Sequence, residues 1–136
     1  MYCFNDVVPI QSPLSFGKLL TDDMRLRDFG IEINIRESRR DSHQRYMVTC
    51  KDIFAFRVTG EPYLADFWDK DILEYAKRGN YFYIRTSRWI DELSVNTMFS
   101  SLMNQSKTEP RHYVLTALDF IFEFISASEP TVTAQE

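Results

Sequence analysis

The sequence predicts an α+β fold, with an antiparallel sheet of five or six strands shaped as a roll or half-barrel and one or two helices. Three observations predict it. Apolar and polar residues alternate along several short segments, which is typical of strands with one face in water. Aromatic residues, which favour strands, make up 15% of the chain. One longer segment instead repeats its apolar residues at helical spacing.

The length and composition predict a single domain over residues 1–128 and a flexible tail over residues 129–136. A chain of 136 residues can bury one core without a disulfide or metal, and no change in composition marks a linker. The N-terminal segment through Pro13 is expected to lie extended over the core. The tail is polar and contains Pro130, so it is expected to be disordered.

The clearest strand is predicted over residues 29–38, where Ile31, Ile33 and Ile35 alternate with polar residues. Residues 39–43 are predicted to turn the chain, and residues 44–50 to form a hairpin with the first strand. Lys51 and Asp52 then interrupt the pattern before a strand over residues 53–59. This interruption is either a tight turn or a bulge that bends one long strand, and we favour the bulge.

A helix is predicted over residues 65–78, since its apolar residues recur at helical spacing and Gly79 follows its last turn. Residues 81–85 form a strand by composition, and Ser87 can cap a short helix that starts at Arg88. A further strand is predicted over residues 112–116. Residues 118–125 fit either a helix or a strand, and their aromatic and β-branched content favours the strand.

Charge and composition exclude several classes of protein. The net charge of -4 and the pI near 5.2 argue against a nucleic-acid-binding protein, and the basic cluster around Arg39 and Arg40 is read as a solvated hairpin tip. No segment is apolar enough to span a membrane, and the N-terminal residues do not resemble a signal peptide. Two cysteines, Cys3 and Cys50, fit reduced thiols, so a cytoplasmic location is expected.

The sequence has no pattern of a known catalytic, cofactor or metal site. Its four glycines form neither a phosphate-binding loop nor a nucleophile elbow. The residues that could bind zinc are scattered singly along the chain: Cys3, Cys50, His43 and His112. We therefore expect no metal, no cofactor and no catalytic residues.

Six residues are the candidates for a binding site. His112 lies near Asp119 and Glu123 and could act as a general base beside a carboxylate, or could be an edge histidine with one hydrogen bond. Three candidates are acidic residues of the predicted helix, which could meet a basic partner or simply complement the helix dipole: Asp69, Asp71 and Glu74. The other two, Tyr81 and Tyr83, share one face of a strand and could form an interface or pack in the core.

Two segments carry a resemblance to known proteins. These are AFRVTGEP at residues 55–62 and RHYVLTALDFIFEFIS at residues 111–126. The chain resembles small uncharacterised bacterial α+β proteins and, in general build, immunity proteins that neutralise polymorphic toxins. This resemblance implies a noncatalytic protein that works by binding another protein.

Two hypotheses of function follow. The first is a noncatalytic protein-binding domain, possibly immunity-like, of a bacterial cytoplasmic protein. The second is a small-ligand carrier or weak enzyme with an aromatic pocket near His112. Pairing with a second copy of the chain fits both. Finding His112 hydrogen-bonded to a carboxylate at the floor of a water-filled cleft would contradict the first hypothesis.

Overall fold

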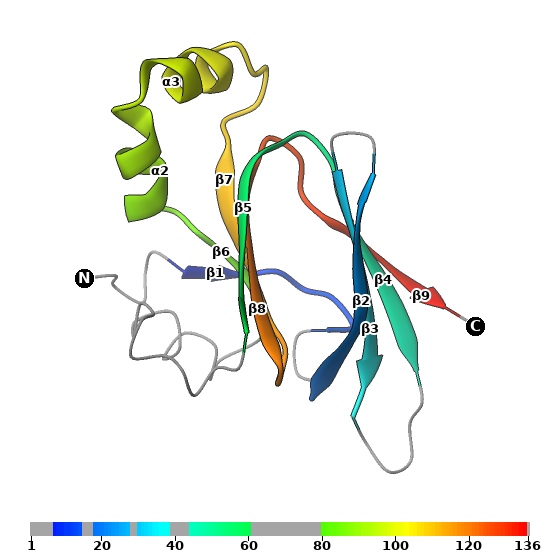
Figure 1. The fold of residues 1–136 in the computed structure, drawn as a ribbon. Coiled ribbons are helices and arrows are strands. Elements are labelled where there is room, and N and C mark those ends of the chain that lie inside the picture. Colours follow the sequence, from blue (N-terminus) through cyan, green and yellow to red (C-terminus); the bar gives the residue numbers. More distant parts are fainter. Residues whose placement is uncertain (1–6, 15–17, 28–29, 39–43, 61–79, 136) are drawn as a thin grey trace.

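The computed structural model describes residues 7–14, 18–27, 30–38, 44–60 and 80–135 (Figure 1). Within these ranges the chain forms two helices and nine strands in two antiparallel sheets, so the predicted α+β class is confirmed. The prediction of one sheet rolled into a half-barrel is wrong, because the strands divide between two separate sheets that do not close into a barrel.

The larger sheet has five strands, and the smaller sheet has four. The order across the five-stranded sheet is β1 (Val7–Pro9), β6 (Tyr81–Ile84), β7 (Arg111–Thr116), β8 (Phe120–Ser126) and β5 (Ile53–Gly60). The order across the four-stranded sheet is β2 (Leu19–Arg27), β3 (Gly30–Glu37), β4 (Arg45–Cys50) and β9 (Thr131–Gln135). Among the described residues, β5 and β2 are therefore edge strands of their sheets.

The main core lies between the two sheets, which pack face to face (Figure 1). The isoleucines of β3 and the phenylalanines of β8 meet there in one buried cluster that includes Ile33, Ile35, Phe122 and Phe124. Side chains alternate across a strand, so every second residue of each strand points into this layer. The predicted hairpin is confirmed, since β3 pairs with β4 from Ile31 opposite Cys50 to Arg36 opposite Arg45.

The chain passes from the smaller sheet to the larger one at Lys51 and Asp52. The predicted bulge that bends one long strand is wrong here, because β4 and β5 belong to different sheets. Asp52 has a φ of 53°, a left-handed conformation that aspartate tolerates better than most residues. This change of direction is the physical reason for two sheets. A bulge does occur, but within β5 between Ile53 and Ala55.

Two short helices lie beside the five-stranded sheet, on the side away from the smaller sheet (Figure 1). They are α2 (Arg88–Ser94) and α3 (Thr97–Asn104). The predicted cap is confirmed, because the Ile90 amide donates to Ser87 Oγ at 3.1 Å. The predicted strands over residues 81–85, 112–116 and 118–125 are also confirmed, with slightly different ends.

The C-terminal segment corrects a prediction. Residues 131–135 form β9, which pairs with β4 along five residues, in place of the expected flexible tail. The hydroxyl of Tyr81 donates to the carbonyl oxygen of Pro130 at 3.1 Å and holds the start of this segment.

Two predicted elements cannot be compared with the structure. The turn at 39–43 and the helix over 65–78 lie outside the described residues. Among the residues that are described, no helix is long and apolar enough to cross a membrane.

Candidate functional site

His112 joins two hydrogen bonds inside the protein, one at each ring nitrogen. Its Nε2 lies 2.7 Å from Glu123 Oε1, and its Nδ1 lies 2.7 Å from Ser87 Oγ. The side chains of His112 and Glu123 have no exposed surface. The sequence placed His112 near Asp119 and Glu123, and the structure brings it to Glu123 alone. The Asp119 carboxylate instead accepts bonds from the backbone amide and hydroxyl of Thr21.

The hydrogen bonds define where the protons lie in the neutral form of His112. A carboxylate only accepts hydrogen bonds, so Nε2 carries the proton and donates it to Glu123. The other nitrogen, Nδ1, then accepts the hydroxyl proton of Ser87. The oxygen of Ser87 also accepts the Ile90 amide, and no other donor in the described part of the chain binds its second lone pair.

Arg57 and Trp89 complete this group of side chains. The guanidinium of Arg57 binds Glu123 through two nitrogens, Nε to Oε2 and Nη2 to Oε1, the latter at 3.1 Å. The same guanidinium lies 4.3 Å from the centre of the Trp89 ring, and that ring meets His112 edge to face at 5.3 Å. The buried carboxylate is therefore compensated by a cation and a ring N–H donor.

Strand pairing explains how these residues meet. Arg57 stands directly opposite Glu123 across β5 and β8, and His112 is opposite Ile125, two residue pairs further along β7 and β8. Directly opposite and diagonal positions on one face of a sheet are within side-chain reach. The outer face of β8 carries Ile121, Glu123 and Ile125, so the acidic residue interrupts an apolar face.

Ser87 connects this group to a pocket at the molecular surface. The pocket has a volume of about 490 Å³ and lies between α2, α3 and the segment that leads into β7. Ser87 lines it together with polar residues that include Arg85, Asp91, Thr108 and Glu109. Only 4% of Ser87 is exposed, and His112 lies behind it. The pocket beside His112 is therefore polar, unlike the aromatic pocket that the second hypothesis expected.

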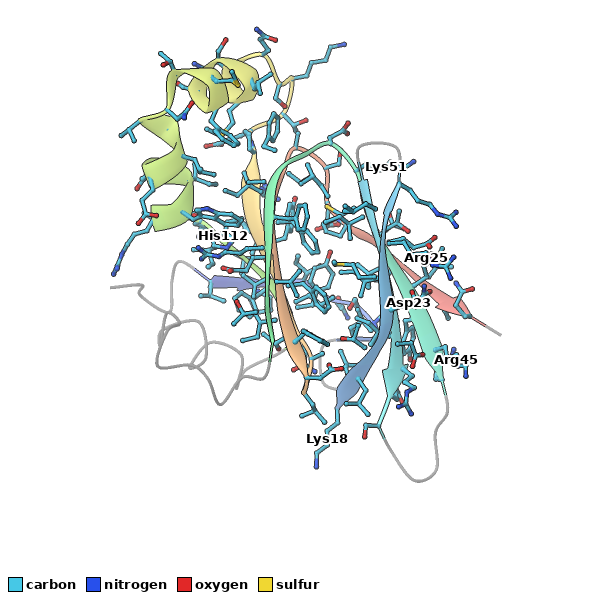
Figure 2. The ribbon with its side chains drawn as sticks, viewed as in Figure 1. Lys18, Asp23, Arg25, Arg45, Lys51 and His112 are labelled. Carbon is cyan, nitrogen blue, oxygen red and sulfur yellow. The ribbon has the colours of Figure 1, made fainter. Side chains whose placement is uncertain are left out.

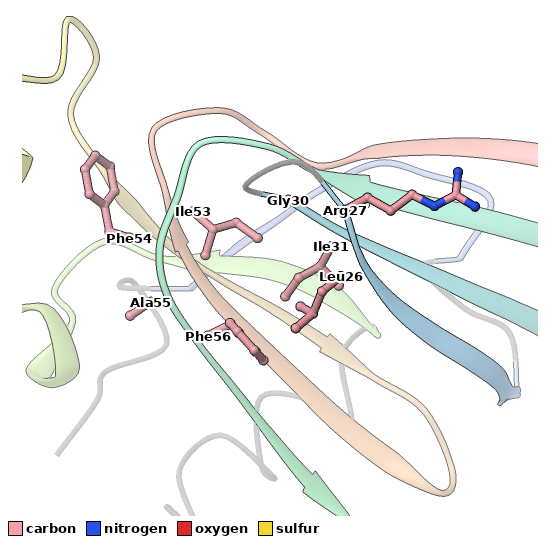
Figure 3. Close-up of a pocket in the computed structure, with 8 residues that line it drawn as sticks. All are labelled: Leu26, Arg27, Gly30, Ile31, Ile53, Phe54, Ala55 and Phe56. Carbon is pink, nitrogen blue, oxygen red and sulfur yellow. The ribbon is translucent and has the colours of Figure 1, made fainter.

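A second feature is an apolar groove of about 400 Å³ between the edge strands β2 and β5. Figure 3 shows Leu26, Ile31, Ile53 and Phe56 pointing into the space between these strands, whereas Arg27 points away from it. Leu26 is 66% exposed, Phe56 41% and Met24 37%. These three residues were not among the predicted site residues, although large apolar side chains on an edge strand are the signal that could have identified them.

Of the remaining predicted site residues, the two that the structure describes, Tyr81 and Tyr83, line neither the polar pocket nor the apolar groove. Tyr81 is buried in the main core between the sheets, which supports the core interpretation and not an exposed interface. Tyr83 is half-buried, packs against Tyr113 and lies under the guanidinium of Arg111 at 4.4 Å. Asp69, Asp71 and Glu74 lie outside the described residues.

Comparisons with family models, with curated proteins and with solved structures give no match for this chain.

Proposed function

We propose that this protein is a protein-binding domain that holds an extended segment of a partner protein along the edge of β2, over the apolar groove. The observation that carries the proposal is the exposure of Leu26, whose side chain lies at the groove and is two-thirds in water. An extended segment can add to a free strand edge through backbone hydrogen bonds and place alternate side chains in a pocket.

The groove fits the apolar side of such a segment. Met24 and Leu26 alternate along β2 and lie on its inner face, because they pair opposite the buried Ile33 and Ile31. Phe56 of β5 closes the other side of the groove. An exposed patch of large apolar side chains on one side of a small protein is typical of an interaction surface.

The charges of β2 indicate the polar side of the partner. Arg25 and Arg27 lie on the outer face of the strand and are exposed. Their ion pairs with described residues are long, 3.7 Å from Arg25 to Asp23 and 4.0 Å from Arg27 to Glu32. A partner strand beside them would place alternate residues opposite these arginines. We therefore expect the segment to alternate apolar with acidic residues.

The resemblance to immunity proteins suggests a class of partner. A toxin of a polymorphic system that presents such a segment would be neutralised by being held on this groove. Asp69, Asp71 and Glu74 remain a predicted acidic contact for a basic part of the same partner.

Site-specific photocrosslinking can test the proposal. The photoreactive residue p-benzoylphenylalanine replaces Leu26 in one version of the full chain and Val95 in the other. Val95 is a matched control, since it is 88% exposed and lies after α2, outside the groove lining. The crosslinked partner is identified, purified, and titrated against wild type and the variants Leu26→Asp, Arg25→Glu and Val95→Asp.

We expect crosslinking at Leu26 and not at Val95. Binding of the purified partner should weaken more than about tenfold for Leu26→Asp, because an apolar contact at the centre of the interface is lost. It should weaken less for Arg25→Glu and stay unchanged for Val95→Asp. Equal crosslinking at both positions, or an unchanged affinity of the partner for the Leu26→Asp variant, would refute the proposal. Crosslinks only between copies of this chain would show that the groove pairs two copies instead.

A further inference from the structure

We propose that Ser87, His112 and Glu123 form a catalytic triad, in which Ser87 is the nucleophile that hydrolyses esters of small polar acyl groups bound in the adjacent pocket. This proposal is independent of the groove between β2 and β5. It replaces the expectation of a protein without catalytic residues.

The geometry of the three side chains is that of an activated serine. A serine nucleophile needs a base within hydrogen-bond reach, and the base needs a third group that orients it. Ser87 Oγ is 2.7 Å from His112 Nδ1, and His112 Nε2 is 2.7 Å from Glu123 Oε1. Because Nε2 of His112 carries the ring proton, Nδ1 is the acceptor of the Ser87 proton. The unused lone pair of Ser87 is the one that can attack.

The surrounding contacts fix this arrangement. Glu123 is held by both nitrogens of Arg57, so its carboxylate cannot rotate away from His112. The edge-to-face contact with Trp89 restrains the imidazole ring. Ser87 is held by the Ile90 amide at the start of α2. Such rigid support keeps reacting groups in a productive geometry.

A substrate can reach Ser87 through the pocket, whereas His112 is buried behind it. Ser87 is part of the pocket wall, and a volume of about 490 Å³ suits a small substrate. The polar lining includes the cation Arg85 and the acids Asp91 and Glu109, which match polar groups on an acyl chain. A hydrogen bond from His112 to a carboxylate at the floor of a cleft contradicts a noncatalytic protein. His112 makes that hydrogen bond to Glu123, and Ser87 is the residue of the three that lines the pocket.

The reaction needs only the ester and water. Ser87 Oγ forms a bond to the ester carbonyl carbon, and its proton moves to His112 Nδ1. The bond between this carbon and the alcohol oxygen breaks, and the leaving alcohol takes the proton from Nδ1. Water then attacks the acyl-serine and gives a proton to Nδ1. The bond to Oγ breaks, the carboxylic acid leaves, and Ser87 regains its proton. Glu123 remains a carboxylate and stabilises the imidazolium that forms in both steps.

Labelling with a fluorophosphonate probe can test the triad. The probe phosphonylates an activated serine with loss of fluoride, and peptide mapping by mass spectrometry locates the modified residue. The variants are Ser87→Ala, Glu123→Gln and the control Asn96→Ala. Asn96 is matched to Ser87 because its side chain also caps a helix, accepting the Met98 amide at 3.0 Å, and it does not line the pocket. Circular dichroism melts check that each variant is folded.

We expect one phosphonyl group on Ser87 of the wild type, none on Ser87→Ala, and full labelling of Asn96→Ala. Hydrolysis of p-nitrophenyl acetate should fall by roughly a hundredfold or more in Ser87→Ala and in Glu123→Gln, since the members of a triad act as a unit. If Glu123→Gln does not fold, the probe result on Ser87→Ala decides alone.

A folded wild type that is not labelled at Ser87, or hydrolysis that survives Ser87→Ala, would overturn the triad. The variant Leu26→Asp should hydrolyse the ester like wild type. Failure of the triad therefore leaves the groove proposal untouched, and failure of the groove proposal leaves the triad untouched.

Discussion

Arg57 and Glu123 face each other directly across β5 and β8, and they differ sharply in their contact with water. The Glu123 side chain has no exposed surface, whereas the Arg57 side chain is 42% exposed. His112, which also binds Glu123, lies on the side of the five-stranded sheet where α2 lies (Figure 2). Arg57 thus reaches from the surface to a buried carboxylate and neutralises its charge. Without it, His112 is the remaining hydrogen-bond partner among the side chains described around Glu123.

Replacing Arg57 should therefore cost much more stability than replacing a surface arginine. We expect Arg57→Met to lower the free energy of unfolding by about 3 kcal/mol, because it leaves a buried carboxylate without its cation. The matched variant Arg25→Met breaks an exposed ion pair with Asp23 and should cost less than about 1 kcal/mol. Urea unfolding at neutral pH measures both. Equal losses would show that Glu123 does not depend on Arg57.

Two phenylalanines distinguish the buried core between the sheets from the open groove. Phe124 and Phe56 stand opposite each other on β8 and β5, but Phe124 is buried and Phe56 lies at the groove. We expect Phe124→Ala to cost about 3–5 kcal/mol of unfolding free energy, and Phe56→Ala less than half of that. Chemical denaturation of both variants gives the comparison. A larger loss from Phe56→Ala would mean that the groove is closed in solution.

The strand with the clearest pattern in the sequence, β3, has one face in the core. Along β3 the isoleucines are buried and their neighbours are not, so the alternation is visible in the residue types. By contrast β2 was not predicted, because most of this edge strand is exposed and its apolar residues, Met24 and Leu26, lie at an open groove. The strand β9 was missed because its threonines pair with β4, a contact distant in the sequence.

The candidate site was predictable only in part, for a similar reason. His112 and a neighbouring carboxylate were predicted from their closeness along the chain, and the cap at Ser87 from a local pattern. Their meeting depends on how β7 pairs with β8 and on where α2 lies against the five-stranded sheet, and neither is encoded in local sequence. Arg57 lies 66 residues from Glu123, so nothing in the local pattern connects them.

Removing the last strand should destabilise the protein, since this segment is paired and not a free tail. A chain that ends at Pro130 loses the backbone pairing with β4 and exposes the edge beside Val48, which is opposite Val132. We expect a fall in the midpoint of thermal unfolding of several degrees, as for a loss of about 1–2 kcal/mol. Removal of Glu136 alone is the control. An unchanged midpoint in the shorter chain would support the flexible tail that the sequence predicted.

Gly30 marks a close approach of β3 and β4 in the smaller sheet. A Cβ atom at this position would lie 2.6 Å from the carbonyl oxygen of Cys50, which is backbone and cannot move aside easily. We therefore expect Gly30→Ala to lower the free energy of unfolding by about 1–3 kcal/mol, the usual cost of overpacking. Gly60→Ala is the control, because its Cβ would meet only the side chain of Phe120 at 3.3 Å. The prediction fails if urea unfolding ranks the two variants in the opposite order.

Stability should fall in alkaline solution through groups buried between the sheets. Burial raises the pKa of the Cys50 thiol from 9.0 to about 11, and burial also raises the pKa of the Tyr81 and Tyr113 hydroxyls above their ordinary value of 10.0. The folded protein thus keeps protons that the unfolded chain releases from about pH 9 upward, so these groups stabilise the fold fully below pH 9. The contribution of Cys50 is lost as the pH rises through 11, and those of the two tyrosines are lost above their ordinary pKa of 10.0. Urea midpoints at about pH 7, 9 and 10.5 should therefore be equal at the first two values and lower at the third. The variant Tyr81→Phe has no hydroxyl proton to lose, so its urea midpoint should fall less between pH 9 and 10.5 than that of wild type. An equal fall in the two proteins would exclude Tyr81 as a source of the effect.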